Sequence, residues 1–132
     1  MLKMFKLASL AMAAMAANFS CAHAFSFSFD WGAIPKCTTG NPNVVNSPMF
    51  KLVEIPAGAA TINFRLKDID APNFNHGGGT VAYLGKPEII SGAFKYQSPC
   101  PPNGSHTYVW TATVFDKAGK RLTSASSSQR YP

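Results

Sequence analysis

The sequence predicts a mainly β protein folded as a small β-sandwich, and three observations support that class. Segments in which apolar and polar residues alternate recur along the chain, as in strands with one buried face. Stretches rich in glycine and proline separate these segments, and the 132 residues include ten of each. After the N-terminal region, no window of ten or more residues keeps the apolar period of a helix. Several short strands of this kind favour two packed sheets.

The N-terminal residues have the pattern of a cleaved signal peptide. Lys3 and Lys6 supply positive charge, an apolar run covers residues 7–17, and Ala22 and Ala24 stand where a signal peptidase recognises small residues. The run is shorter than the roughly 20 apolar residues needed to span a bilayer. We therefore expect residues 1–24 to be removed by cleavage after Ala24. The alternatives are cleavage at a nearby position and retention of the segment. The remaining domain is then periplasmic or secreted, without a transmembrane segment.

The domain that cleavage leaves, residues 25–132, is long enough for one compact core with little stability to spare. Loss of two lysines lowers the formal net charge from +6 to +4. The remaining cations are scattered, with no arginine-rich run and no basic stretch interleaved with aromatic residues. We therefore expect no nucleic-acid partner.

The first half of the domain contains three predicted strands. Residues 25–31 place four aromatic side chains at alternate positions, so that they share one face. Residues 32–48 contain glycines and prolines among polar residues and are expected to be irregular. Residues 50–55 form a short strand that ends at Pro56. Residues 61–68 show the clearest alternation of apolar and polar side chains.

The second half contains three more strands, predicted at residues 80–84, 89–96 and 107–115. Residues 71–79 precede them as a loop, because they include Pro72 and three consecutive glycines. Residues 98–105 hold three prolines and cannot form regular structure. The serine-rich tail from Thr123 is an edge strand or is frayed.

Two cysteines remain after cleavage, Cys37 and Cys100, because Cys21 leaves with the signal peptide. Two cysteines in an exported domain most often pair, and the alternative is a pair of buried free thiols. In the chain-entropy model, a disulfide that closes so long a loop stabilises the fold by about 4 kcal/mol.

Two carboxylates and two histidines are the candidates for chemistry. Asp68 and Asp70 stand two apart at a strand end, where both would point to one face as a ligand site or as a solvated terminus. His76 opens the glycine run, whose bare amides could approach an anion closely. His106 directly precedes the long strand. These four residues could also form a metal site, but no short ligand spacing supports it, and we expect no metal and no cofactor.

Three motifs in this order resemble those of the phosphatidylethanolamine-binding proteins. They are IPAG at 55–58, DIDAP at 68–72 and SPCPPNGSHTYVW at 98–110. The resemblance covers roughly residues 50–116. Within the family, the chain most resembles the bacterial exported proteins called Raf-kinase-inhibitor-like proteins. Ile69, Ser98 and Thr107 depart from that family's usual residues. The segment 76–83 also departs from it, and long connections beyond that segment are missing, so the family fold is expected in trimmed form.

The resemblance implies a non-enzymatic β-sandwich with a surface pocket for a small phosphorylated or anionic molecule. It assigns the pocket to the residues Asp68, Asp70, His76, Pro99, Pro101, His106 and Tyr108. Imidazole and backbone N–H groups donate to phosphate oxygens, and carboxylates accept from an ammonium group. The alternative function is a protein-interaction module, such as an inhibitor of a hydrolase or protease, that uses the proline-rich and glycine-rich loops as its contact surface.

Overall fold

A computed structural model describes residues 24–132, so the predicted signal peptide lies outside the described residues except for Ala24. Within this range the chain forms nine strands and no helix, which confirms the mainly β class. No helical segment in residues 24–132 has the length and apolar character to cross a bilayer.

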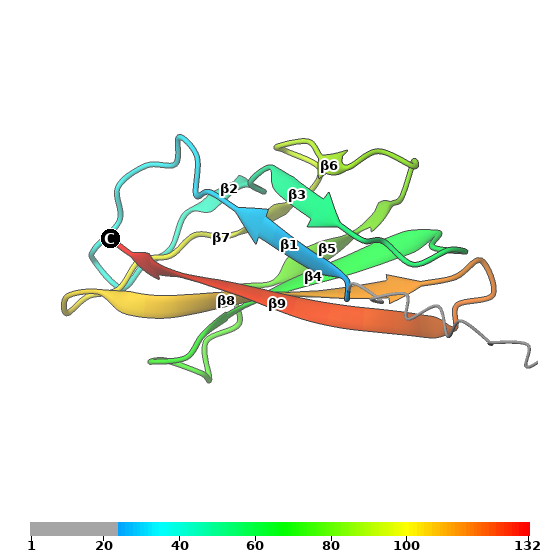
Figure 1. The fold of residues 1–132 in the computed structure, drawn as a ribbon. Helices are drawn as coiled ribbons and strands as arrows, with labels where there is room; N and C mark the ends of the chain where they lie inside the picture. The colour runs from blue at the N-terminus through cyan, green and yellow to red at the C-terminus, as the bar shows by residue number, and fades with distance from the viewer. Residues whose placement is uncertain (1–23) are drawn as a thin grey trace, which may run out of the picture.

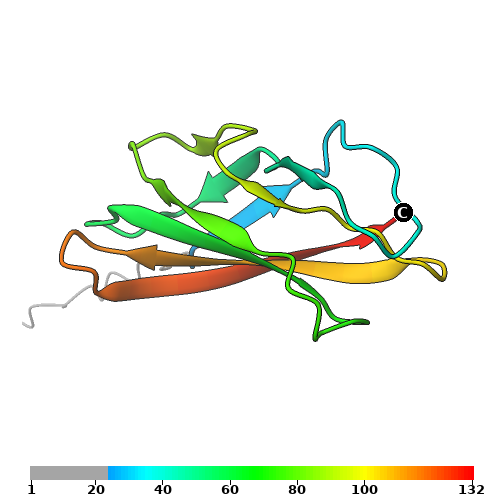
Figure 2. The same cartoon turned by 180° about the vertical axis from the view of Figure 1, so that it is seen from behind.

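The strands lie in two layers, and every pairing is antiparallel (Figures 1 and 2). One layer is a four-stranded sheet in the order β5-β4-β8-β9, built from β4 (Thr61–Asp68), β5 (Gly78–Ala82), β8 (His106–Phe115) and β9 (Arg121–Tyr131). The facing layer contains a three-stranded sheet in the order β1-β3-β6, of β1 (Ser26–Phe29), β3 (Phe50–Val53) and β6 (Glu88–Ile89). It is completed by the pair β2 (Val44–Asn46) and β7 (Lys95–Gln97).

The core lies between the layers and follows from the alternation of apolar residues along the strands. The inward side chains of β4 and β8 are almost fully buried, while their outward neighbours are partly or fully exposed. The rings of Phe50 and Phe64 stack across the two layers at 4.1 Å, and Trp110 meets Phe50 edge-on at 5.3 Å. Aromatic pairs in these geometries add about 0.5–1.5 kcal/mol each beyond their buried area.

The pairing of β4 with β8 brings two distant sequence motifs together. Asp68 at the end of β4 lies opposite Tyr108 near the start of β8, in a ladder of eight residue pairs. The turn that follows β4 and the proline-rich segment that precedes β8 therefore meet at one end of the four-stranded sheet. This end holds the candidate site.

Two expectations about individual strands were wrong. β2 lies inside the segment predicted to be irregular, because three residues between two prolines carry no readable period. The predicted strand 89–96 is split into β6 and β7, which belong to different sheets. The serine-rich tail forms β9, an edge strand of the four-stranded sheet that pairs with β8 along its length, which confirms the first of its two alternatives.

The glycine run is the third correction, because two of its three glycines are packed in a sheet and do not form a flexible anion-binding loop. Gly78 and Gly79 lie in β5. A Cβ on Gly78 would stand 1.8 Å from the carbonyl oxygen of Phe64, and one on Gly79 would stand 2.6 Å from the side chain of Phe94. Glycine is therefore required here because a neighbouring strand and an aromatic ring occupy the space of a side chain.

Candidate functional site

A small pocket of about 200 Å³ opens at the end of the four-stranded sheet where β4 stops and β8 begins. Of the residues predicted for a site, five line it: Asp68, His76, Pro101, His106 and Tyr108. Two others do not. Pro99 is fully buried and is not among the lining residues, and the carboxylate of Asp70 is directed toward the backbone of β8. The geometry thus brings most of the predicted set around one concavity.

Asp68 is buried, with only 3 % of the residue exposed, and its carboxylate joins the turn after β4 to His106. Its Oδ1 accepts the backbone N–H groups of Asp70 at 2.9 Å and Ala71 at 3.2 Å, which forms the turn after β4. Its Oδ2 lies 2.6 Å from Nδ1 of His106. The prediction of a solvated strand end is therefore wrong for Asp68, because its oxygens have internal partners.

Asp70 holds the same turn against the neighbouring strand β8. Its Oδ2 accepts the backbone N–H of Thr107 at 2.8 Å, and the N–H of Ile69 donates to the carbonyl oxygen of Thr107 at 3.0 Å. The carboxylate therefore positions the start of β8, including His106, without lining the pocket.

The two histidines are each tied through Nδ1. A carboxylate oxygen of Asp68 and the carbonyl oxygen of Gln97 can only accept, so Nδ1 of His106 and Nδ1 of His76 carry the hydrogens. The His76 contact is 2.8 Å long. Nε2 of each ring is left as the nitrogen available to a ligand.

Aromatic rings pack against both histidines. Tyr108 lies 5.5 Å from His76 and 6.3 Å from His106, measured between ring centroids, and Phe74 packs edge-on against His76 at 4.6 Å. Burial, and next to it the negative charge of Asp68, raises the pKa of the Tyr108 phenol, which stays neutral as a hydrogen-bond donor. Burial lowers the pKa of His76 below 6.5, which makes its ring neutral at pH 7.

The disulfide between Cys37 and Cys100 confirms the predicted pairing and builds one wall of the pocket. Cys100 is a lining residue, and it draws the segment after Cys37 against the pocket, where the N–H of Gly40 donates to the Cys100 carbonyl at 3.1 Å. Sequence reasoning missed the wall residues Gly40, Pro42, Ala71, Phe74 and Pro102. The only signal for the first two was their proximity to Cys37.

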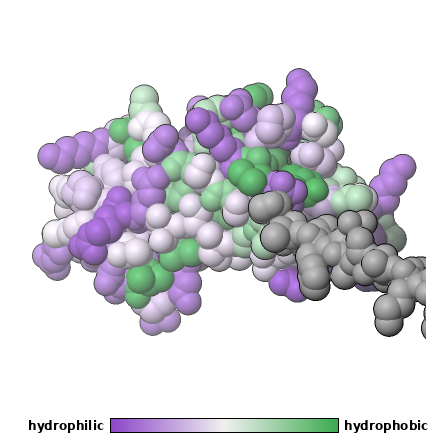
Figure 3. Space-filling model, viewed as in Figure 1, coloured by the Kyte–Doolittle hydropathy of each residue, from purple (hydrophilic) through white to green (hydrophobic). Residues whose placement is uncertain are grey.

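The pocket mouth lies next to an exposed apolar patch on the loop between β4 and β5. Ile69 is 52 % exposed and Phe74 is 42 % exposed. In Figure 3 apolar side chains gather on the part of the molecule that hangs below the four-stranded sheet, where Figure 1 shows this loop. A ligand with an apolar part next to its polar group would find contacts there.

The residues Asp68, Asp70 and His106 place one ligand-type atom each within 4.8 Å of the others, so they are the group best placed to hold a metal ion. His76, the fourth residue of the predicted set, is not part of the group. Asp68 Oδ2 and His106 Nδ1 share a hydrogen bond, and Asp70 Oδ2 is used by Thr107. A metal ion would have to replace these bonds, so the arrangement favours positioning of His106 over metal ligation.

Comparisons with protein-family models, with curated proteins and with solved structures found no match to this chain. The resemblance to the phosphatidylethanolamine-binding proteins therefore stays a prediction that rests on the three motifs.

Proposed function

We propose that the chain is an exported binding protein for a small molecule that carries a singly charged phosphate or a similar anionic group. The observation that carries the proposal is the pair of histidines in one pocket, each held through Nδ1 so that Nε2 is left for the ligand. Protonated imidazole donates strong hydrogen bonds to phosphate oxygens. The family resemblance implies the same class of ligand.

The charges around the pocket limit the ligand further. No lysine or arginine is among the lining residues, and the carboxylate of Asp68 lies beside His106. The Asp68 carboxylate repels a dianion about twice as strongly as it repels a phosphodiester or a singly protonated phosphate, and the ammonium group of a zwitterion offsets that repulsion. The pocket volume of about 200 Å³ is smaller than that of a drug-sized site and suits a head group.

The disulfide is consistent with a periplasmic or extracellular location, because such bonds persist mainly in oxidising compartments. It supports the proposed export independently of the signal-peptide pattern.

The protein-interaction alternative receives less support. It requires the proline-rich and glycine-rich segments to be accessible, and they are so only in part. Pro99 and Pro101 are fully buried and Gly79 lies close to Phe94, whereas residues 102–104 are exposed. Cys100 lines the pocket but is held in the disulfide, so its sulfur is not free to act as a nucleophile. We therefore favour binding without chemistry.

Calorimetry of the mature protein, residues 25–132, with glycerophosphoethanolamine and dimethyl phosphate tests the proposal, because the charge of these phosphodiesters does not change between pH 5.5 and 7.5. Because binding of an anion needs a protonated His76, we expect affinity to rise at least threefold as pH falls from 7.5 to 5.5. Affinity that is independent of pH would contradict the assigned role of the histidines.

The variants His76→Asn and His106→Asn sharpen the test. An asparagine amide can keep the hydrogen bond that Nδ1 makes, but it removes Nε2. We expect each variant to fold and to bind at least tenfold more weakly, while the control Lys117→Gln, in the turn after β8, binds as before. Unchanged affinity in both histidine variants, or no binding to any phosphate compound by the parent, would overturn the proposal.

A further inference from the structure

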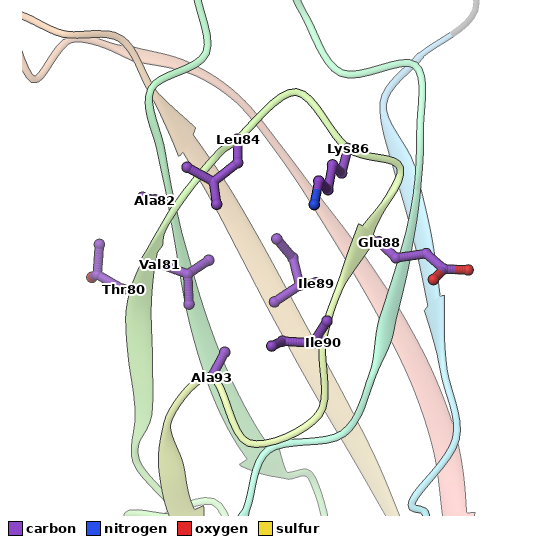
Figure 4. A pocket seen from close by; sticks show the side chains of 9 residues that line it. All are labelled: Thr80, Val81, Ala82, Leu84, Lys86, Glu88, Ile89, Ile90 and Ala93. Atoms are coloured by element: carbon purple, nitrogen blue, oxygen red, sulfur yellow. The ribbon is translucent and has the colours of Figure 1, made fainter.

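A second and larger cleft, of about 410 Å³, lies on another side of the molecule, between the edge strand β5 and the segment that carries β6 (Figure 4). Its apolar lining comes from Val81, Leu84, Ile89, Ile90 and Ala93. It shares no lining residue with the histidine pocket. Its volume falls within the range of about 300–1,000 Å³ that is typical of small-molecule sites.

The cleft exposes apolar side chains that the core does not use. Leu84 is 77 % exposed and Ile90 is 74 % exposed, the highest values among the large hydrophobic residues of 24–132. Figure 4 shows Leu84, Val81 and Ile90 around one opening. Contiguous apolar surface on a small domain is typical of a binding site, because covering it with an apolar group releases ordered water.

One charged group points into this apolar cleft. Figure 4 shows the ammonium group of Lys86 directed inward from the rim, whereas the carboxylate of Glu88 is directed away from the opening. The ion pairs within residues 24–132 do not include Lys86. The cleft therefore combines an apolar floor with a positive charge that has no carboxylate partner in the described part of the chain.

We propose that the cleft binds a small amphipathic monocarboxylate, with its alkyl chain between Val81 and Ile90 and its carboxylate on Lys86. The apolar floor stabilises the chain, and charge complementarity selects the head group. A simple alcohol lacks the charge, and a cationic amphiphile would be repelled by the ammonium group. The proposal stands on residues separate from those of the histidine pocket and does not depend on the function proposed for it.

Calorimetry of the mature protein with decanoate, at concentrations below micelle formation, provides the test, with decanol and decyltrimethylammonium as comparison probes. We expect decanoate to bind at least fivefold more tightly than either comparison probe. Lys86→Gln should weaken decanoate binding about fivefold, the effect of one partly exposed ion pair. The matched control Lys117→Gln should leave it unchanged.

A cleft-filling variant, Ala93→Phe, separates binding in the cleft from binding elsewhere. We expect it to abolish decanoate binding while the protein keeps its melting temperature within a few degrees and keeps its phosphate binding. Three results would overturn the proposal: no decanoate binding by the parent, equal binding of decanol, or no effect of either Lys86→Gln or Ala93→Phe. A fourth is a concentration-dependent dimer that Ile90→Asp dissociates, without decanoate binding, since that would assign the cleft to a second copy of the chain.

Discussion

The substitution Gly79→Ala tests the packing that places His76, which lies two residues before β5. In a flexible loop, replacing glycine by alanine stabilises a protein by about 0.4–1 kcal/mol, because the unfolded chain loses conformational freedom. In the folded chain, the new Cβ would stand 2.6 Å from Cβ and Cγ of Phe94. The two interpretations of the glycine run therefore predict effects of opposite sign.

The size of the destabilisation depends on whether the Phe94 side chain can move away from the new Cβ. Phe94 stacks on Phe50 at 6.2 Å and on Phe64 at 5.9 Å, and it meets Trp110 at 5.7 Å, so its ring cannot retreat without disturbing the core. Overpacking of this kind costs about 1–3 kcal/mol. For a domain of this size, the melting temperature should fall by roughly 5–15 °C.

Urea unfolding of the parent, Gly79→Ala, Phe94→Ala and the double variant measures this coupling. In the Phe94→Ala background the contact with Cγ is gone, and the remaining Cβ is no longer held in place by a packed ring. Gly79→Ala should therefore cost less there than in the parent, with a coupling energy of about 1 kcal/mol or more. Gly85→Ala is the control, because nothing lies within 4 Å of its added Cβ. Its positive φ of 78° should still cost about 1–2 kcal/mol, but that cost should not depend on Phe94. Stabilisation of the parent by Gly79→Ala would refute the packing argument.

Two further predictions concern the disulfide and the buried histidine. Replacement of both Cys37 and Cys100 by serine should lower the free energy of unfolding by about 4 kcal/mol and weaken phosphate binding, because Cys100 holds the Gly40 wall of the pocket; unchanged phosphate affinity in the folded variant would show that the wall does not need the bond. Burial lowers the pKa of His76 below 6.5 in the folded state, so below that pH the unfolded chain binds more protons than the folded chain. The free energy of unfolding, measured with urea, should therefore fall as pH drops below about 6.5 and level off below the folded-state pKa of His76. The variant His76→Asn should lack this part of the pH dependence. The same pH dependence in the variant and the parent would show that His76 is not its source.

The strands with strong alternation were predictable because their pattern is local. β4 occupies the predicted residues 61–68, and β8 begins one residue before the predicted start. The cysteine pairing was also predictable, since the predicted removal of the signal peptide leaves only two candidates. Within the site, the motifs identified Asp68, Pro101, His106 and Tyr108, and the resemblance outside the motifs added His76; all five line one pocket.

The misses share a physical cause, which is that partners distant in the sequence decide the structure. β2 and β7 exist because each supplies the other's backbone hydrogen bonds, and three-residue strands have too few side chains to show a period. The role of Asp70 could not be inferred from its spacing, because its acceptor function depends on where the N–H of Thr107 lies.

The sequence by itself determined the class of the fold, its longest strands, the disulfide and the residue types around the histidine pocket. These properties depend on side-chain period, on composition and on short motifs. Only the tertiary structure decided that Asp68 is hydrogen-bonded to His106, that glycines 78 and 79 are required by packing, and that Lys86 points into an apolar cleft. Those features are distances between groups far apart along the chain, and they exist only after the two layers have packed together.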